Sequence, residues 1–154
     1  MVMKVRPATN RDAPFVRDLV FSALDEFGLR DCHEGCDQDL DDLEASYPAR
    51  GGFFDVLVNE NDQVVGSVGV FPRGDATCEL RKMYLRPQFR GQGHGKMLLD
   101  HAIQKARSLG FTRMELETSS RLTRAIELYR RNGFEPFHPS AMIPRCDQAW
   151  VRAI

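Results

Sequence analysis

The sequence predicts one α/β domain over residues 1–154, with helices packed on a mixed, mostly antiparallel sheet. Strand-like and helix-like segments alternate along the chain. Three strand-like segments follow one another through short turns, which indicates hairpins. The later strands are separated by helices, which indicates crossover connections. A chain of 154 residues with 42% hydrophobic residues is long enough for one core, with about six or seven strands and about four helices.

The first elements are a strand at Met3–Arg6 and an amphipathic helix over residues 10–27. Thr9 stands at the N-cap position, and Asp12 lies three residues on, where a capping box places an acidic residue. Gly28 is expected to end the helix, because glycine readily adopts the left-handed conformation that follows helix ends.

The middle of the chain predicts three consecutive strands at Phe53–Asn59, Val64–Phe71 and Ala76–Leu85. Residues 60–63 and the segment Pro72–Asp75 separate them as turns. The remaining elements are helices at Gly93–Leu109 and Thr123–Asn132, and strands at Arg113–Thr118, Phe134–Phe137 and Gln148–Ile154. The long helix should make a right-handed βαβ crossover between the strands on either side of it.

A glycine-rich loop, Arg90-Gly91-Gln92-Gly93-His94-Gly95-Lys96, lies between a predicted strand and the long helix. Its glycines let backbone N–H groups turn toward one point, and the helix N-terminus adds donors and partial positive charge. The loop therefore predicts an anion site suited to phosphate or pyrophosphate. A nucleotide P-loop would need Ser or Thr where Met97 stands, and a dinucleotide fingerprint would need Gly where Lys96 stands. The alternative is a helix start that binds no ligand.

The segment Arg90-x-x-Gly93-x-Gly95 resembles the Gln/Arg-x-x-Gly-x-Gly/Ala signature of the GNAT superfamily of acyl-CoA-dependent N-acetyltransferases. Three further segments also resemble the family: Arg6–Asp12, Glu79–Pro87 and Ala125–Phe134. The resemblance spans residues 4–137 and implies a GNAT-like fold. In that fold the central strands splay apart, and the acyl-pantetheine arm lies between them.

The resemblance implies acetyl-CoA as cosubstrate and no metal. Backbone groups of Met83, Tyr84 and Leu85 would pair with the pantetheine arm, much as a strand pairs with a peptide. The residues expected around the pyrophosphate are Gly91, Gln92, Gly93, His94, Gly95 and Lys96. Arg90 would contact the cofactor or position the loop, and the His94 side chain is expected to point away from the chemistry.

Tyr129 occupies the position of the tyrosine that many GNAT enzymes use as general acid toward the departing thiolate. Its phenol would equally suit packing on the sheet. Leu122, seven residues earlier, stands where many relatives have an asparagine that touches the pantetheine. The resemblance therefore implies that one polar contact to the cofactor is missing.

Two carboxylates are candidates for the general base. Glu79 matches a common glutamate of the family's fourth strand, and the alternative is a salt bridge to a neighbouring cation. Glu117 matches a base used in another branch of the family, and Glu115 shares its face as a weaker candidate. A chain of water molecules is a further alternative. Strand alternation would place Glu79, Arg81, Met83 and Leu85 on one face.

The formal net charge of −1 conceals an asymmetry. Residues 1–75 carry 7 Lys/Arg and 15 Asp/Glu, whereas residues 76–154 carry 14 Lys/Arg and 7 Asp/Glu. The basic half holds the loop expected to bind the phosphates of CoA. In the acidic half, residues 31–44 hold seven acidic residues and no Lys or Arg, with a weak helix predicted around Gln38–Ser46. In the GNAT family this region borders the acceptor, so it would attract a cationic amine. A solvated acidic helix start is the alternative.

These observations predict transfer of an acetyl group from acetyl-CoA to a primary amine of a small molecule, peptide or protein, by direct attack in a ternary complex. A non-catalytic acyl-CoA sensor or interaction module is the alternative, because a fold does not settle activity. A nucleic-acid partner would need a basic patch formed by Arg121, Arg124, Arg130 and Arg131, and a polyphosphate cofactor or solvation explains these residues more simply. Homodimers are frequent in the family, but nothing in the sequence specifies an interface.

No run of 18 or more apolar residues is present, and the first residues lack the apolar core of a secretory signal. A cytoplasmic location without membrane contact is therefore expected, and the four cysteines, Cys32, Cys36, Cys78 and Cys146, are expected to be free thiols. The segment from Cys32 to Cys36 contains potential zinc ligands. No second Cys/His pair follows at finger spacing, so no metal site is expected.

Overall fold

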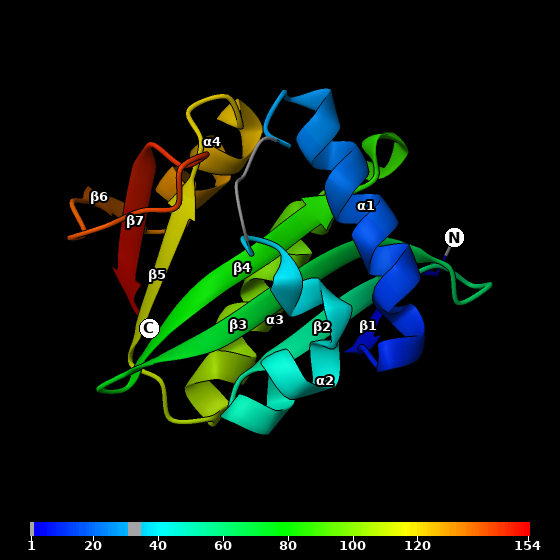
Figure 1. Cartoon of the computed structure of the whole chain (residues 1–154), viewed down its shortest axis with the longest axis horizontal. Coiled ribbons are helices and arrows are strands. Elements are labelled where there is room, and N and C mark those ends of the chain that lie inside the picture. Colours follow the sequence, from blue (N-terminus) through cyan, green and yellow to red (C-terminus); the bar gives the residue numbers. More distant parts are fainter. Residues whose placement is uncertain (1, 31–34) are drawn as a thin grey trace.

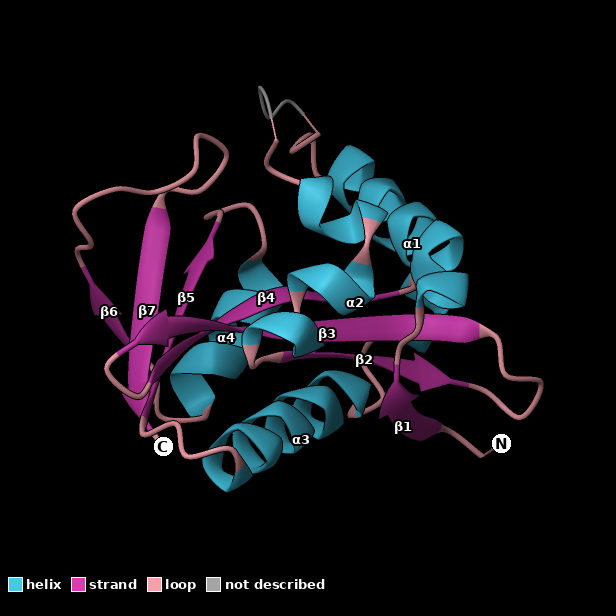
Figure 2. Cartoon of the chain, turned by 60° about the horizontal axis from the view of Figure 1, so that its bottom comes forward, coloured by secondary structure: helices cyan, strands magenta, loops and turns pink. Residues whose placement is uncertain are grey.

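The computed structural model describes residues 2–30 and 35–154. These residues form a seven-stranded sheet in the order β1-β2-β3-β4-β5-β7-β6 (Figure 1). Strands β4 and β5 run parallel, and all other neighbouring strands of this sheet run antiparallel. Helices α1 and α2 cover one face of the sheet, and α3 and α4 cover the other (Figure 2). The predicted mixed sheet with helices on it is confirmed.

The N-terminal elements match the sequence prediction closely. Strand β1 (Lys4–Pro7) leads into a capping box, in which the Thr9 side chain and the Asp12 carboxylate each accept a backbone N–H from the other end of the turn. One 3₁₀ turn precedes helix α1 (Ala13–Glu26). Gly28 follows with φ +67°, the left-handed conformation expected after the helix end.

The acidic segment forms a 3₁₀ turn (Gln38–Asp41) and the short helix α2 (Leu43–Ser46), where one weak helix was predicted. Asp42 separates the two with extended torsion angles, φ −145° and ψ 89°. Its carboxylate accepts the Ala45 N–H at 3.0 Å and so caps α2. Aspartate favours such a cap over a helix interior because its side chain competes for backbone donors.

Three strands follow as a meander: β2 (Phe53–Val58), β3 (Val64–Gly74) and β4 (Thr77–Leu85). Strand β3 extends beyond its predicted end, because Pro72 pairs opposite Cys78 inside the ladder. The turn falls instead at Asp75 and Ala76, which have φ values of 52° and 58°. Two consecutive positive φ values are typical of the tight turns that match the twist of a hairpin.

The C-terminal elements are α3 (His94–Ser108), β5 (Arg113–Thr118), α4 (Thr123–Arg131), β6 (Glu135–Phe137) and β7 (Gln148–Ala153). Their bounds lie close to the predicted ones. Gly133 ends α4 with φ +87°, and the next amide, of Phe134, donates to the Tyr129 carbonyl at 3.0 Å. Strand β7 then inserts between β5 and β6, so that the last strand pairs with both.

Two apolar clusters hold the layers together. The first lies between the sheet and α3, where Leu98, Leu99 and Ile103 are buried. The second lies between the sheet and α1, where Val16 and Leu19 are buried. Each fully buried Leu or Val side chain stabilises the fold by roughly 1.5–3 kcal/mol relative to an exposed one.

A buried carboxylate on β2 anchors α3 to the sheet. Asp55 is 1% exposed and lies 2.6 Å from the His101 imidazole and 2.9 Å from the Lys105 ammonium. Burial raises the pKa of Asp55, and the hydrogen bonds from His101 and Lys105 more than offset this, so the net pKa is lowered. The carboxylate is therefore ionised and fully partnered inside the fold.

Two cysteines behave as expected and one does not. Cys78 and Cys146 are free thiols. Cys36 is disulfide-bonded, so the expectation of free thiols was wrong for this residue. Cys32 and the other candidate ligands at 31–34 lie outside the described residues, and in the remainder no group of three or more His, Cys, Asp or Glu is placed to hold a metal ion. No helix in the described part of the chain is long and apolar enough to cross a membrane.

Candidate active site

The sheet opens between β4 and β5, which diverge in Figure 1. The two strands pair over three positions, Thr77–Glu79 with Arg113–Glu115. Beyond Glu79 the β5 side of β4 has no partner strand among the described residues. A cavity of about 1120 Å³ lies at this opening. Its walls come from β4, β5, α1, α4, the glycine-rich loop and the loop over residues 138–147.

A β-bulge lies where β4 leaves β5. Gly69 of β3 opposes Arg81 and Ser67 opposes Tyr84, so two residues of β4 face one residue of β3. The first of the two, Lys82, has φ +54°, and the Ser67 hydroxyl donates to its carbonyl at 2.6 Å. A bulge bends its strand and increases its twist, which accounts for the splayed central strands that the resemblance implied.

The bulge also reverses the side-chain alternation along β4. Glu79 and Arg81 lie on the α1/α2 face, where the Arg81 guanidinium stacks 4.1 Å from the centre of the Phe71 ring. Met83 and Leu85 pack into the first apolar cluster, on the α3 face. The prediction that these four β4 residues share one face was therefore wrong, because the extra residue at the bulge shifts the alternation by one.

The glycine-rich loop has the geometry of an anion site. Gly91 and Gly93 have φ values of +73° and +86°, a region that side chains disfavour. Helix α3 starts without a side-chain cap, and its first hydrogen bond joins the Met97 N–H to the Gly93 carbonyl. The N–H groups of the first turn therefore have no acceptor within the helix. A Cβ at Gly95 would lie 3.4 Å from a leucine side chain of α4, which is an ordinary van der Waals contact.

Two cations of this loop line the cavity, and both already have carboxylate partners. The Arg90 guanidinium donates to the Leu85 carbonyl at 3.1 Å and pairs with Glu26 of α1 at 2.6 Å. These contacts position the loop against β4 and α1. The Lys96 ammonium pairs with Asp100 at 2.8 Å and is more than half exposed, so it can turn toward a bound anion.

Eight of the ten cofactor residues inferred from the resemblance line the cavity: Met83, Tyr84, Leu85, Arg90, Gly91, Gly93, Gly95 and Lys96. Gln92 and His94 are not part of the wall. The Gln92 side chain donates to the Gln88 carbonyl, and the His94 ring packs 6.4 Å from that of Phe89. The expected roles of Gln92 and His94 at the pyrophosphate stay predictions.

Tyr129 of α4 lies in the wall of the cavity. Its ring packs on Phe134 with the ring centres 5.7 Å apart, which agrees with the packing alternative, and the role as general acid stays a prediction. Burial raises the pKa of its phenol, with a contribution in the same direction from Tyr84. The hydroxyl is therefore protonated at neutral pH, as a proton donor must be.

Glu79 lines the cavity but is tied to arginines. It is 8% exposed, and one of its oxygens contacts the Arg81 guanidinium directly. Its other oxygen lies 3.7 Å from the Arg73 guanidinium. Both oxygens of Glu79 thus face guanidinium groups, which agrees with the salt-bridge interpretation, and the role of Glu79 as general base stays a prediction.

Glu117 of β5 lines the same cavity with different surroundings. Its carboxylate accepts the Ile143 N–H at 3.0 Å, and no salt bridge reaches it within the described residues. Burial raises its pKa, and the charge of Glu79 adds to the increase. Glu115, the weaker candidate, pairs with Arg113 and does not line the cavity. Glu117 is therefore the one of the three candidate carboxylates that lines the cavity without a salt bridge among the described residues.

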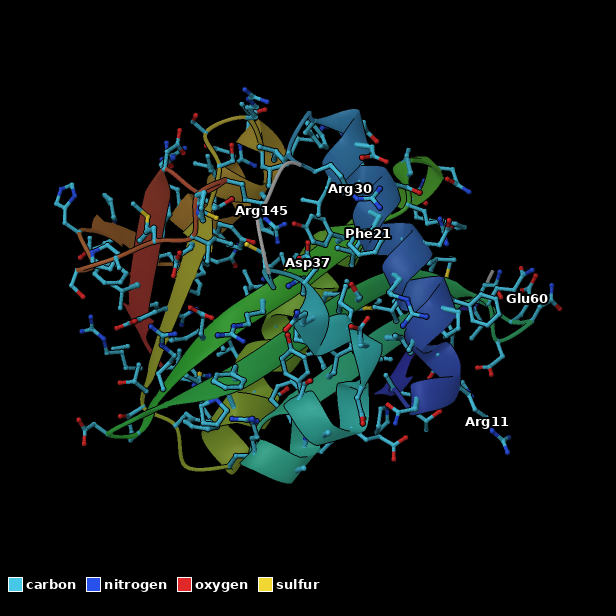
Figure 3. All side chains as sticks on the ribbon, in the orientation of Figure 1. Arg11, Phe21, Arg30, Asp37, Glu60 and Arg145 are labelled. Carbon is cyan, nitrogen blue, oxygen red and sulfur yellow. The ribbon has the colours of Figure 1, made fainter. Side chains whose placement is uncertain are left out.

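A buried ion network closes the cavity on the α1/α2 side. The Lys82 ammonium lies 3.2 Å from Asp37 and 3.1 Å from Asp39. Arg145, from the loop over 138–147, holds Asp37 through two hydrogen bonds of 2.9 and 2.7 Å (Figure 3). The Tyr47 hydroxyl donates to Asp39. Two acidic side chains of the acidic segment are thus neutralised by cations from distant parts of the chain.

Other acidic side chains of this segment serve the local fold. Asp42 caps α2 and accepts from the Asn10 side chain at 2.9 Å. Glu44 accepts the Asn10 backbone N–H at 2.8 Å. Asp31 and Glu34 lie outside the described residues. The described acidic residues therefore give little support to the interpretation of this segment as a rim for a cationic amine.

The four arginines of the possible basic patch have separate roles. Arg121 donates to the carbonyls of Phe27 and Gly28, and Arg130 and Arg131 both pair with Glu127. Arg124 lines the cavity. Leu122, in the position of the family's asparagine, also lines the cavity, beside the polar Ser119.

Sequence reasoning missed several charged residues of the cavity, above all Arg73, Lys82 and Arg145. Arg73 was placed in a turn, and Lys82 was expected on the other face of its strand. Arg145 lies 108 positions from its partner Asp37, so no spacing could have linked them. If the strand alternation had allowed for a bulge in β4, it would have placed Lys82 on the cavity side, but it would not have identified Arg73 or Arg145.

Comparisons with known proteins agree with this geometry. The family model described as acetyltransferase (GNAT) family matches residues 18–134. An uncharacterized N-acetyltransferase of Escherichia coli, YjgM, is 36% identical over 137 residues, with 85% of this chain and 81% of that protein covered. The crystal structure of a GNAT-family acetyltransferase from Staphylococcus aureus Mu50 superimposes with a TM-score of 0.92 at 21% identity, covering 99% of both chains.

A phosphinothricin acetyltransferase of the same superfamily from Sinorhizobium meliloti, solved in complex with AcCoA, superimposes with a TM-score of 0.75 at 19% identity. It covers 100% of this chain and 89% of its own. At these identities the solved structures establish the fold alone. The family match covers most of the chain and agrees with the splayed strands and the glycine-rich loop. We conclude that this chain belongs to the acetyltransferase (GNAT) family.

Proposed function

We propose that the protein transfers an acetyl group from acetyl-CoA to a primary amine within a ternary complex. One observation carries the proposal: the open edge of β4 and the uncapped N-terminus of α3 meet at the same cavity. An extended backbone edge is suited to the amide-bearing pantetheine arm. A helix start rich in free N–H groups is suited to a pyrophosphate.

The residues present fit coenzyme A. The first turn of α3 offers N–H groups that no side chain caps, and the glycines leave room for an anion to approach the backbone. Lys96 adds a mobile positive charge at the same end. When bound, acetyl-CoA supplies an activated thioester, and the chain needs only to hold, orient and exchange protons with the reacting groups.

Glu117 and Tyr129 take the two proton steps. Glu117, directly or through a water molecule, accepts a proton from the amine nitrogen as the N–C bond forms. A backbone N–H on the open edge of β4 steadies the negative charge on the carbonyl oxygen. Tyr129 donates its proton to the sulfur as the C–S bond breaks, and the products are an N-acetylated amine and a free thiol. Glu79 holds Arg81 in place beside them.

The acceptor is a primary amine on a small molecule, or on a peptide or protein. The competing proposal is an acyl-CoA sensor without catalysis, which would use the same cofactor contacts. Release of free thiol from acetyl-CoA in the presence of a panel of amines separates the two. Amine-dependent release supports the transferase. If no amine causes thiol release while CoA still binds, the result would support the acyl-CoA sensor.

A further inference from the structure

Four cationic side chains line one side of the cavity. Its wall on the α1/α2 side includes Arg73, Arg81, Lys82 and Arg145. Lys82 and Arg145 are neutralised by the two aspartates of the buried network, as described above. The two arginines that remain, Arg73 and Arg81, face two carboxylates of the cavity, those of Glu79 and Glu117.

Arg81 is the arginine that holds Glu79 firmly. Its guanidinium contacts one Glu79 oxygen directly and stacks on the Phe71 ring. Its side chain is 27% exposed, and the stacking fixes the plane of the guanidinium. Arg81 has little freedom to turn toward a substrate.

Arg73 is different, because it is held loosely and reaches the cavity from the end of β3. Its guanidinium lies 3.7 Å from Glu79, beyond hydrogen-bond distance, and its side chain is 45% exposed. Arg73 and Glu117 line the same cavity, and the charge of Arg73 opposes the net rise in the pKa of the Glu117 carboxyl. The cavity therefore has a half-exposed, weakly paired cation in the same wall as the group that would receive the amine's proton.

We propose that Arg73 binds a carboxylate of the acceptor, so that the substrate class is an amino acid or another compound whose primary amine lies a few bonds from a carboxylate. This inference rests on the proposed acetyl transfer. The amine then lies toward Glu117 and the carboxylate toward Arg73, which matches a zwitterion to two opposite charges. A guanidinium is suited to this task because its planar donors match a carboxylate in pairs.

The size of the effect follows from the loss of one charge-assisted contact. Hydrogen bonds to charged groups contribute about 1.5–3 kcal/mol, which corresponds to a change of about ten- to hundredfold in kcat/KM. The value of kcat/KM should decrease for acceptors that have a carboxylate and stay the same for acceptors that lack one.

The test compares matched acceptors in the thiol-release assay. The set contains α-amino acids, the corresponding amino-acid amides, and amines that lack the carboxyl group. The protein variants are Arg73→Gln, Arg73→Lys and a control, Arg107→Gln, at an exposed arginine of α3 outside the cavity. Affinity for CoA, measured by calorimetry, checks that each variant is folded and holds the cofactor.

We expect the wild-type protein to prefer at least one amino acid over its own amide by about tenfold or more. Arg73→Gln should abolish that preference, Arg73→Lys should restore part of it, and Arg107→Gln should leave it unchanged. Equal rates with acids and amides, or an equal loss with both in Arg73→Gln, would overturn the role of Arg73 but leave acetyl transfer standing. Absence of thiol release with every amine, with CoA bound, would overturn acetyl transfer itself.

Discussion

The choice between two glutamates as general base leads to the sharpest prediction. Glu117 carries no ion pair among the described residues and accepts one backbone N–H, whereas Glu79 is tied to Arg81. In Glu117→Gln the amide oxygen can still accept the Ile143 N–H. The free energy of unfolding should therefore fall by less than about 1 kcal/mol. The rate should fall by the usual factor for a general base, about 100- to 10,000-fold in kcat.

Such a rate loss corresponds to about 2.7–5.5 kcal/mol in the activation free energy, several times the loss of stability. In Glu79→Gln the loss of stability should instead exceed the rise in activation free energy. Arg81, partly buried, would lose its carboxylate, at a stability cost of about 1–3 kcal/mol, with a smaller effect on the rate. The assays are steady-state thiol release at saturating acetyl-CoA and urea unfolding of both variants.

The pH dependence gives a second readout of the same prediction. A base must be deprotonated to act, and burial raises the pKa of Glu117. The kcat of the wild-type protein should therefore rise with pH, and the midpoint of this rise should lie above the ordinary pKa range of glutamate. Glu117→Gln should lose this pH dependence. A large rate loss in Glu79→Gln with near-normal kcat in Glu117→Gln would refute the assignment.

Three further variants test other parts of the structure. Tyr129→Phe should lower kcat about ten- to ten-thousand-fold with unchanged CoA affinity in calorimetry; weaker CoA binding at a normal rate would indicate packing alone. Gly93→Ala strains a residue at φ +86° by about 1–2 kcal/mol and should weaken CoA binding, whereas Gly51→Ala, at φ +94° and remote from the cavity, should leave it unchanged. Asp55→Asn should lower the free energy of unfolding by about 1–3 kcal/mol at pH 7. Because the folded-state pKa of Asp55 is lowered, this difference should shrink as pH falls below the ordinary aspartate range, and a pH-independent difference would contradict the ionised pair.

Local patterns predicted most of the fold because local interactions set the element ends. Thr9 and Asp12 form the capping box that their spacing indicates, and Gly28 and Gly133 adopt the positive φ expected after helices. The hydrophobic periodicity likewise predicts β4, the third strand of the meander, and α3, the crossover helix. The loop at Gly93 was predicted to bind an anion because its glycines have few other physical uses at a helix start.

The acceptor side could not be predicted because its chemistry depends on contacts between distant residues and on one irregularity. The bulge at Lys82 follows from the packing of three strands, and no local pattern signals it. In the sequence Asp37 has no cation near it, whereas in the fold it pairs with both Lys82 and Arg145. Charge counting along the chain therefore does not reveal which acidic residues are already neutralised in the folded protein.

A crystal structure of the protein with acetyl-CoA would test the central proposal most directly. We predict that the pantetheine arm lies along the open edge of β4 and that the pyrophosphate sits on the first turn of α3. The sulfur should then lie within hydrogen-bond reach of the Tyr129 hydroxyl, with the acetyl carbonyl carbon facing Glu117. A complex in which the arm leaves the β4 edge, or in which the thioester lies out of reach of both Tyr129 and Glu117, would contradict the proposed transfer.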